Sequence, residues 1–415
     1  MSIEADALHL LKTRRKDYSL PQTFYTSQEI FDLDMRHIFG RNWLFVALSC
    51  EVPQPGNWVT VKVGNDSVVI VRGQDSEIRA FFNTCRHRGS QVCIGASGKA
   101  KRLVCPYHQW SYDLDGSLAR ARFMDEDFEP KDFGLKPVHL QNLAGYLFIS
   151  LAENPPDFSA VRRDLEPFIK LQDIENCKVV HTQTLVEKAN WKLVLENNRE
   201  CYHCNGSHPE LLRTLAVFDS DTDPRVDQAY RDLLANYGNK WEGLGIPHAH
   251  TPHSLQHRAI RLPFLEGALS MTMDGALASK KLLGNFTDPD LGSVRMLSLP
   301  NSWNHLLSDH VLAFRVLPLG PQLTEMQGKW LVHKDAVEGV DYDMHHLTHV
   351  WDETNVQDQV LAEDNQAGIN SRAYQPGPYS SVVEGGVRNF ISWYTDELED
   401  ELERKVAPVP RLAAE

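Results

Sequence analysis

Hydrophobic and polar residues alternate with a period of two in a series of short runs in the first third of the chain. This is the period of β-strands, whose successive side chains point to opposite faces of a sheet. Gly64-Asn65 and residues 73–76 supply turns between neighbouring runs. The runs occupy residues 43–48, 57–63, 67–72, 78–83, 111–118 and 145–150. The pattern therefore predicts a small domain built of β-strands.

A helical period precedes this β region. Thr26-Ser27-Gln28-Glu29 has the pattern of a capping box, and apolar residues follow it at helical spacing. We expect an amphipathic helix over residues 27–39 that ends at Gly40.

Asn154-Pro155-Pro156 marks the clearest boundary in the chain, because proline interrupts regular structure. Beyond it, strand patterns at residues 178–187, 291–300 and 312–317 mix with helical patterns at 158–171, 190–198, 341–368 and 389–405. The expected fold class is α+β, a small all-β domain plus a larger domain with an antiparallel sheet flanked by helices. We expect N-terminal helices at 1–40 that pack on the larger domain, the β domain at 41–155 and the larger domain at 156–415.

The composition is that of an ordinary globular protein, with 42% hydrophobic and 24% charged residues among 415. A net charge of −14 argues against a nucleic-acid partner and suits docking to a basic redox partner. No signal-peptide core and no run of about 18 apolar residues is present, so we expect a cytoplasmic protein without membrane contact. Seven cysteines, an odd number in a long chain, favour a reducing compartment over a disulfide scaffold.

Two mixed pairs of cysteine and histidine form a metal-binding set, Cys85-x-His87 and Cys105-x-x-His108. A zinc finger puts two cysteines in one pair and two histidines in the other, whereas each pair in this chain holds one of each. Imidazoles in place of two of the four thiolates on one iron define a Rieske [2Fe-2S] cluster. The pairs therefore favour a Rieske cluster over a structural zinc site.

Glu200, His203 and His208 form a second group of metal-type residues. Glu200 and His203 are expected to share a helix face, whereas His203 and His208 would diverge by about 140° on a regular helix, so the helix must break between them. Two imidazoles and one carboxylate make the facial triad that suits non-haem Fe(II). The pattern alone does not choose that carboxylate from 56 acidic residues. Two histidines in a polar loop are by themselves more typical of a surface, but a Rieske centre upstream favours the iron site.

Cys201-x-x-Cys204 overlaps this second group. The spacing resembles a redox dithiol, but no βαβ pattern surrounds it, and Asn205 stands where a c-type haem motif needs histidine. We interpret both cysteines as packing residues.

Together these motifs resemble the oxygenase component of Rieske-type non-haem iron oxygenases, the ring-hydroxylating oxygenase alpha-subunit family. The resemblance rests on the mixed pairs, on the run from Asn197 to His208, and on Asp358 with Gln366 eight residues later. Residues 196–210, 330–334 and 374–379 are most similar to the branch that holds glycine betaine monooxygenase and stachydrine demethylase. The likeness spans nearly the whole chain.

The resemblance implies a role for each candidate residue. His203, His208 and Asp358 would bind a mononuclear iron in the catalytic domain, while Glu200 would link His203 to a cluster ligand of the neighbouring subunit in a homotrimer. Many ring-hydroxylating relatives carry Asp at the position of Glu200, and the glutamate is shared with quaternary-amine oxygenases. The ligands of the [2Fe-2S] cluster would be Cys85, His87, Cys105 and His108.

The implied reaction is N-demethylation of a quaternary ammonium betaine with O2. Hydroxylation of an N-methyl carbon of glycine betaine would give a hemiaminal that collapses to formaldehyde and dimethylglycine. A quaternary ammonium has no N–H to donate, so an aromatic cage is expected, with Trp303 as one candidate wall. A basic residue should meet the substrate carboxylate, and the sequence does not choose it from Lys280, Lys281 and the other candidates. No GxGxxG motif or P-loop occurs, so we expect electrons from a separate flavin and iron-sulfur reductase that uses NAD(P)H.

Several alternatives stay open at the level of the sequence. Within the family they are a stachydrine or carnitine oxygenase and an aromatic ring-hydroxylating dioxygenase alpha subunit. Outside it they are a Rieske electron-transfer protein without catalytic iron and a zinc-binding structural protein. The long segment after the β domain argues against an electron carrier, which needs far less chain.

Overall fold

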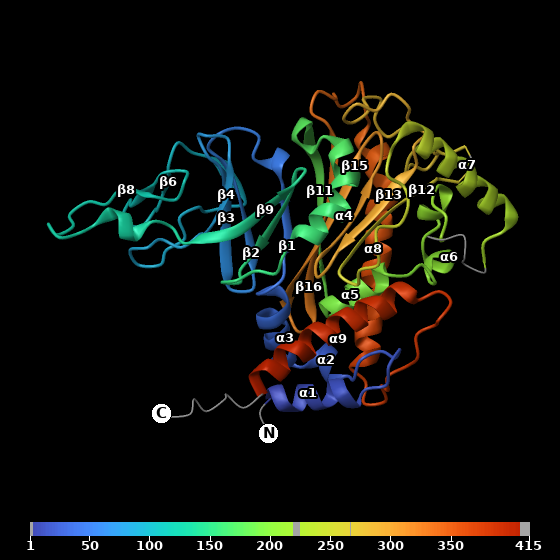
Figure 1. Ribbon diagram of the computed structural model, residues 1–415, viewed down its shortest axis with the longest axis horizontal. Helices are drawn as coiled ribbons and strands as arrows, with labels where there is room; N and C mark the ends of the chain where they lie inside the picture. The colour runs from blue at the N-terminus through green and yellow to red at the C-terminus, as the bar shows by residue number, and fades with distance from the viewer. Residues whose placement is uncertain (1–2, 219–224, 266, 407–415) are drawn as a thin grey trace, which may run out of the picture.

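The computed structural model describes residues 3–218, 225–265 and 267–406. In Figure 1 a β-rich lobe lies to one side of a larger lobe, in which helices surround a broad sheet. None of the helices in the described ranges combines the length and the apolar character needed to cross a bilayer.

The β-rich lobe contains two antiparallel sheets. The larger has seven strands in the order β1-β10-β9-β4-β3-β2-β5, and the smaller has the order β6-β7-β8. The larger sheet consists of β1 (Leu44–Leu48), β2 (Asn57–Val63), β3 (Asp66–Arg72), β4 (Ile78–Phe82), β5 (Ser97–Lys99), β9 (Pro137–Leu143) and β10 (Tyr146–Ser150). The smaller sheet consists of β6 (Leu103–Val104), β7 (Ser111–Tyr112) and β8 (Leu118–Arg120).

Strand β3 shows why this lobe has two apolar layers. Val68 and Ile70 face the main core, whereas Val69 and Val71 face a separate core under the loops of the small sheet, and all four side chains are fully buried. Alternating side chains of one strand thus serve both faces of the sheet.

The larger lobe is built on one six-stranded antiparallel sheet in the order β11-β16-β15-β14-β13-β12. Its strands are β11 (Cys177–Glu187), β12 (His257–Leu262), β13 (Ser293–Ser298), β14 (Ser302–Leu306), β15 (Val311–Gly320) and β16 (Leu323–His333). Its helices are α4 (Ser159–Ile169), α5 (Trp191–Asn198), α6 (Cys204–Ser207), α7 (Gln228–Leu244), α8 (Met344–Ile369) and α9 (Gly385–Val406). Helix α8 packs against α5 and β11, and α4 packs against β12.

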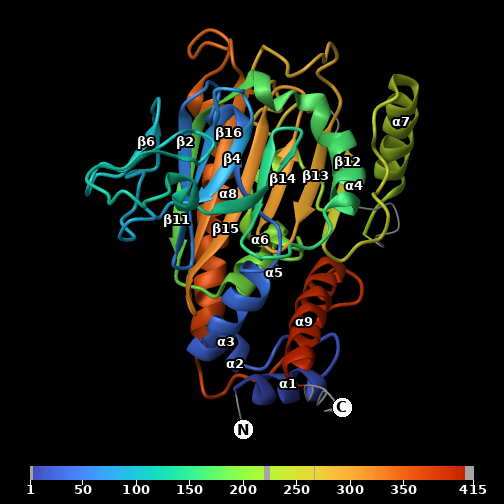
Figure 2. The same cartoon turned by 60° about the vertical axis from the view of Figure 1, so that its left-hand side comes forward.

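The N-terminal helices α1 (Ile3–Thr13), α2 (Thr23–Thr26) and α3 (Gln28–Asp34) lie under the larger lobe. Helix α1 packs against α9 at the far end of the chain, as Figure 2 shows. Beside them, Asp34 is fully buried and forms an ion pair with the equally buried Lys192 of α5. The same carboxylate accepts hydrogen bonds from Trp191 Nε1 at 2.9 Å and from Tyr394 Oη at 2.7 Å.

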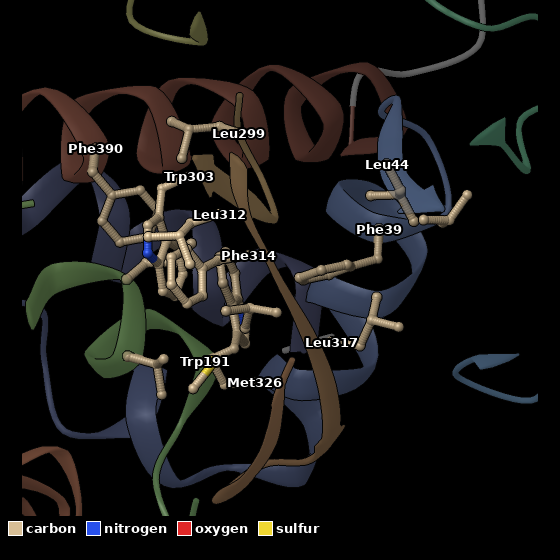
Figure 3. Close-up of a cluster of buried hydrophobic side chains, with 14 of the residues drawn as sticks. Phe39, Leu44, Trp191, Leu299, Trp303, Leu312, Phe314, Leu317, Met326 and Phe390 are labelled. Atoms are coloured by element: carbon tan, nitrogen blue, oxygen red, sulfur yellow. The ribbon is translucent and has the colours of Figure 1, made fainter. Parts of the chain in front are cut away.

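One apolar core joins these parts, and Figure 3 shows a section of it. Phe39 and Trp191 meet edge to face with ring centroids 5.0 Å apart, and Phe390 of α9 lies 5.8 Å from Trp191. Trp191 begins α5, so helices from both ends of the chain fix the element that leads into the second group of metal-type residues.

The expected helix over residues 27–39 is wrong in its second half. Ser27 is the N-cap and accepts hydrogen bonds from the backbone N–H groups of Glu29 and Ile30, but α3 ends at Asp34. The chain continues as a π-helix over Met35–Phe39, in which Gly40 N donates to Met35 O at 2.8 Å. The wider turn buries His37, Ile38 and Phe39 in succession, which a regular amphipathic helix would not do.

Candidate active site

Two loops of the β-rich lobe carry the mixed cysteine and histidine pairs, and they have the same backbone geometry. In the first loop Cys85 N donates to Ser90 O at 2.8 Å and Gly89 N donates to Cys85 O at 3.0 Å. Cys105, Gln109 and Trp110 repeat this pattern in the second loop, at 3.0 and 2.9 Å. Gly89 and Gln109 occupy equivalent positions and both have positive φ, 80° and 60°. The two loops therefore present their ligand side chains in matching ways.

Burial divides the four candidate ligands of the cluster into two kinds. Cys85 and Cys105 are 3% and 2% exposed, whereas His87 and His108 are exposed, with ring centroids 4.6 Å apart. Burial raises the pKa of the Cys85 thiol, so a thiolate at this position needs a metal to stabilise it. The two buried thiols and the two exposed imidazoles would suit a Rieske cluster that is held by cysteines on its buried side and by histidines on its exposed side.

Aromatic side chains support both exposed rings. Trp110 stacks on His87 at a centroid distance of 4.9 Å, and Tyr107 stacks on His108 at 3.8 Å. Beneath them the Tyr112 hydroxyl accepts a hydrogen bond from Arg86 N at 3.0 Å and lies 3.3 Å from Cys85 Sγ. Because the hydroxyl oxygen already accepts from Arg86, its own proton is free to be donated to the sulfur.

Glu200, His203 and His208 follow α5, but Glu200 and His203 do not share a helix face as expected. The helix ends at Asn198, and the chain loops before the one-turn helix α6, which has His203 as its N-cap and His208 as its C-cap. The loop itself brings Glu200 Oε1 to 2.6 Å from His203 Nδ1. The other oxygen of Glu200 accepts a hydrogen bond from the backbone N–H of Tyr202.

Three potential metal ligands converge at this loop. His203 Nε2 and His208 Nε2 are 3.1 Å apart, and Asp358 Oδ1 lies 3.4 and 3.0 Å from them. Asp358 comes from α8, far along the chain, so the structure brings all three sequence-predicted side chains together. Its Oδ1 is buried and faces the two ring nitrogens.

Hydrogen bonds to the Nδ1 atoms of His203 and His208 leave the Nε2 atom of each ring available to bind a metal. Gln357 Nε2 donates to Glu210 at 2.8 Å, so Gln357 Oε1 is left to accept from His208 Nδ1 at 2.8 Å. The Glu200 carboxylate likewise accepts from His203 Nδ1. The lone pairs of both Nε2 atoms and of the Asp358 Oδ1 atom therefore point at one another. Only a shared cation or a proton relieves the repulsion between them. This donor set fits a mononuclear iron.

A proton and a metal compete for this position. Desolvation opposes the charged form of His203, but hydrogen bonds to Asp358 and Glu200 outweigh it and raise the pKa of His203 to about 9. Metal binding must therefore displace a proton from the pair of rings.

Cys201 and Cys204 are not the packing residues that we expected, because they form a disulfide with each other. Cys204 Sγ lies 3.9 Å from His203 Nε2, close enough to be considered as a ligand. Its bond to Cys201 makes it a poor donor, so the carboxylate of Asp358 is the better third ligand. The short loop between the cysteines brings the two sulfurs together.

A cavity of about 580 Å³ opens beside the three converging ligands. Trp303 of β14 lines it, stacked on Phe314 at a centroid distance of 5.4 Å, so this side chain is both a wall and a packing residue. Trp351 and His305 line it as well, with ring centroids 4.7 Å apart. Burial, aided by Arg295 and His310, lowers the pKa of His305 to about 3, so its ring is uncharged. The described cavity thus has a wall of neutral aromatic rings.

Lys280 and Lys281 do not line this cavity, so neither of these two candidates meets a substrate carboxylate in it. Lys280 donates to Val340 O at 2.7 Å and Lys281 to Asp335 O at 2.5 Å, both on the surface of the larger lobe. The cations that do line the cavity are arginines: Arg199, Arg225, Arg258 and Arg295.

Sequence reasoning missed Gln357 and Trp351. Trp351 lies seven residues, about two helical turns, before Asp358, so these two side chains are on the cavity side of α8. Gln357 directly precedes Asp358 and contacts His208 and Glu210 instead. The helical spacing to Asp358 was the signal that could have found Trp351.

Comparison with known proteins decides the family. Residues 42–140 match the Rieske [2Fe-2S] domain, and residues 174–400 match the ring hydroxylating alpha subunit (catalytic domain). A glycine betaine monooxygenase oxygenase subunit of Pseudomonas aeruginosa (strain UCBPP-PA14) is 51% identical over 405 residues, which cover 97% of this chain and 94% of the relative. This chain belongs to the ring-hydroxylating oxygenase alpha-subunit family.

Family membership confirms the expected fold class and the two expected cofactors, a Rieske [2Fe-2S] cluster and a mononuclear iron. An alpha subunit of this family is an oxidoreductase, so the alternatives of an electron carrier and of a zinc-binding structural protein are wrong. As an oxygenase subunit it works with a separate reductase on a small molecule.

More distant relatives share the fold. A carnitine monooxygenase oxygenase subunit of Acinetobacter baumannii (strain ATCC 19606) is 40% identical over 209 residues, 48% of this chain and 55% of the relative. The crystal structure of the quaternary ammonium Rieske monooxygenase CntA in complex with L-carnitine has a TM-score of 0.70 at 24% identity, covering 94% of this chain and 98% of CntA. Naphthalene 1,2-dioxygenase from Rhodococcus sp. has a TM-score of 0.66 at 19% identity, covering 96% of this chain and 98% of that one.

Proposed function

We propose that this alpha subunit N-demethylates glycine betaine to dimethylglycine and formaldehyde. One observation carries the proposal: the cavity beside the converging His203, His208 and Asp358 has a wall of uncharged aromatic rings. A trimethylammonium group has no N–H and is held best by ring faces. The identity to a glycine betaine monooxygenase subunit over nearly the full chain supports the same substrate.

In this proposal the iron is bound by His203, His208 and Asp358, and the cluster by the two mixed pairs. The bound metals supply single electrons and activate O2. Trp303 and Trp351 hold the ammonium group with one methyl toward the three ligands. The overall reaction consumes one betaine, one O2, two electrons and two protons, and yields dimethylglycine, formaldehyde and water.

We propose further that electrons reach the iron from the cluster of a neighbouring subunit in a homotrimer. Within one chain the loops beside β6 and β8 lie at the opposite side of the molecule from α6 (Figure 1). Exposed apolar side chains occur near both centres: Ile94, Tyr107 and Phe123 on the β-rich lobe, and Tyr202, Val356 and Val360 near the iron ligands. Contact between these two surfaces of successive subunits would cover them both.

Glu200 is the proposed connection between the two centres. Its Oε1 already accepts from His203 Nδ1, and its side chain is 13% exposed, so the carboxylate lies at the edge of the iron site. Such a carboxylate can accept a further hydrogen bond from the exposed His108 of the next subunit and orient both rings. We propose that the electrons come from a flavin and iron-sulfur reductase that oxidises NAD(P)H.

Formaldehyde release tests the proposed function. The iron-loaded protein, a cognate reductase and NADH are supplied with glycine betaine, proline betaine, carnitine and choline in separate reactions. We expect formaldehyde and dimethylglycine in equal amounts from glycine betaine, with lower kcat/KM for the other three. No formaldehyde from any of the four, or a clear preference for carnitine or proline betaine, would contradict the proposal.

A further inference from the structure

Arg199 lies where α5 ends, directly before Glu200, and its backbone is held on two sides. Arg199 N donates to Glu196 O at 3.1 Å. Its carbonyl oxygen lies against Gly386 at the start of α9, where a Cβ would come within 2.2 Å of that oxygen. Only glycine permits this approach, and the contact fixes the point from which the Arg199 side chain enters the lining of the cavity.

The guanidinium group of Arg199 forms no ion pair with any residue that the structure describes. Its Nε and Nη2 atoms are buried, and neither has a hydrogen-bond partner in residues 3–218, 225–265 and 267–406. Burial, and then the positive charge of Arg258, lower the pKa of Arg199 to about 9. The group nonetheless stays charged at neutral pH. A buried charge without a partner is strongly unfavourable, so the lining around Arg199 is complete only when an anion enters the cavity.

The lining of the cavity therefore has two unlike kinds of side chain. Neutral rings of Trp303, Trp351 and His305 form one part of its lining, and Arg199 and Arg258 form another. A small zwitterion with a quaternary ammonium at one end and a carboxylate at the other matches both. An alcohol such as choline matches only the aromatic part and leaves the arginine unpaired.

We propose that Arg199 is a positioning residue that binds the substrate carboxylate and thereby selects a betaine over a quaternary ammonium alcohol. The guanidinium fork offers two parallel N–H donors to the two carboxylate oxygens. This contact sets the direction in which the ammonium methyls face the iron ligands. The inference rests on the proposed function, because it takes the substrate to be a betaine.

Isothermal titration of the anaerobic holoprotein with glycine betaine and with choline tests the proposal. In Arg199→Gln the Kd for glycine betaine should rise about 30-fold or more, because a buried charged pair is lost. The Kd for choline should stay the same or fall, so that the preference for betaine disappears. Arg199→Lys, which keeps the charge but not the fork, should lie between the two. Arg213→Gln is the matched control, since Arg213 is an exposed arginine outside the cavity lining.

Thermal unfolding without ligand separates binding from a structural role. Removing an unpaired buried charge should leave the Tm of Arg199→Gln and Arg199→Met unchanged or raise it. An unchanged ratio of betaine to choline affinity in Arg199→Gln, or a Tm lowered by several degrees in both variants, would overturn the proposal. If the wild type binds betaine but forms no formaldehyde, the proposed reaction fails while the carboxylate contact is still tested. If the wild type binds neither ligand, both proposals fail.

Discussion

The two metal-type sites of this chain are built on opposite principles. The four cluster ligands come from two equivalent loops only a few residues long, each closed by its own backbone hydrogen bonds. The three candidate iron ligands come from one loop and from a helix about 150 residues later, and other side chains hold them in place. The first site is thus a local structure, whereas the second exists only when the larger lobe is folded.

Exposure divides the sites in the same way. The imidazoles of the cluster set are exposed, but His208 is 1% exposed and Asp358 Oδ1 is buried. An exposed imidazole can hand an electron to another molecule, and a buried set beside a cavity can hold a small substrate away from water. The difference teaches that electron delivery and substrate chemistry are assigned to separate lobes, so substitutions should affect one site without the other.

Asp358→Ala should give the largest separation of the two sites. It removes one of three candidate ligands, so mononuclear iron should be lost and formaldehyde formation should fall by more than about 100-fold. The visible spectrum of the cluster should not change. Metal analysis and the absorbance spectrum of the same sample check both points. Asp364→Ala, on the exposed face of the same helix, is the control, and an Asp358→Ala protein that keeps its iron and activity would refute the assignment.

Glu200→Gln should leave both sites intact and break the communication between them. Gln keeps the shape but loses the charge and half of the acceptor capacity, so the orientation of His203 and of the neighbouring ring is weakened. Both metals should stay bound and the reductase should still reduce the cluster. Reoxidation of the reduced cluster by O2 and betaine should slow by about 100-fold or more in single-turnover mixing. Reoxidation at the wild-type rate would remove Glu200 from the electron path.

Gln357→Leu tests whether the second site depends on its supporting hydrogen bonds. The variant removes the acceptor of the His208 Nδ1 proton, and iron affinity should fall about 10- to 100-fold. Titration of the apoprotein with Fe(II) measures the change. Gln359 on the same helix donates hydrogen bonds to Glu363 and to the Val186 carbonyl, and none to the three iron ligands in the described part of the chain. The control variant Gln359→Leu should therefore bind iron as the wild type does. Equal affinities in the two variants would mean that the Gln357 contact does not position His208.

Tyr112→Phe should have the smallest effect, on the cluster alone. Loss of the hydroxyl near Cys85 Sγ removes a hydrogen bond to sulfur, so the reduction potential should fall by roughly tens of millivolts. A redox titration followed by absorbance measures it, with iron content and thermal stability as checks on folding. Tyr107→Phe, whose ring stacks on His108, serves as control and should leave the potential within error of the wild type. A potential that does not move in Tyr112→Phe would exclude the hydrogen bond.

The sequence could predict the elements that depend on neighbouring residues, but not those that depend on contacts between distant segments. Strands such as Asn57–Val63 were predicted at their observed bounds because alternation is a local signal. The predictions that failed depend on distant contacts. The π-helix at Met35–Phe39 forms where the core accepts three successive side chains, and the loop at Glu200 replaces an expected helical turn.

Several elements of the larger lobe were not predicted. Strands β12 and β14 are buried at nearly every position, so their sequences do not alternate. In β16 the burial does alternate, but Thr324 and Gly328 share the buried face with Met326 and Trp330, so no apolar period marks the strand. Helix α7 lies in a segment without a clear helical period. Asp358 could be chosen only through family resemblance, because the two histidines that it meets lie about 150 residues earlier in the chain. Gln357 carries no local signal, because its partners His208 and Glu210 come from another segment of the chain. Arg199 carries none either, because nothing in its own segment marks it as a cavity residue.

The packing of α1 against α9 has a consequence for synthesis on the ribosome. Every strand of the cluster-binding lobe precedes residue 151, so all of these strands are synthesised before the sheet of the larger lobe. Helix α5, which leads into the iron loop, instead contacts α9, the last helix of the described chain. During translation the strands of the β-rich lobe therefore emerge first. The contact of α5 with α9, next to the iron loop, forms only after the last described helix has emerged.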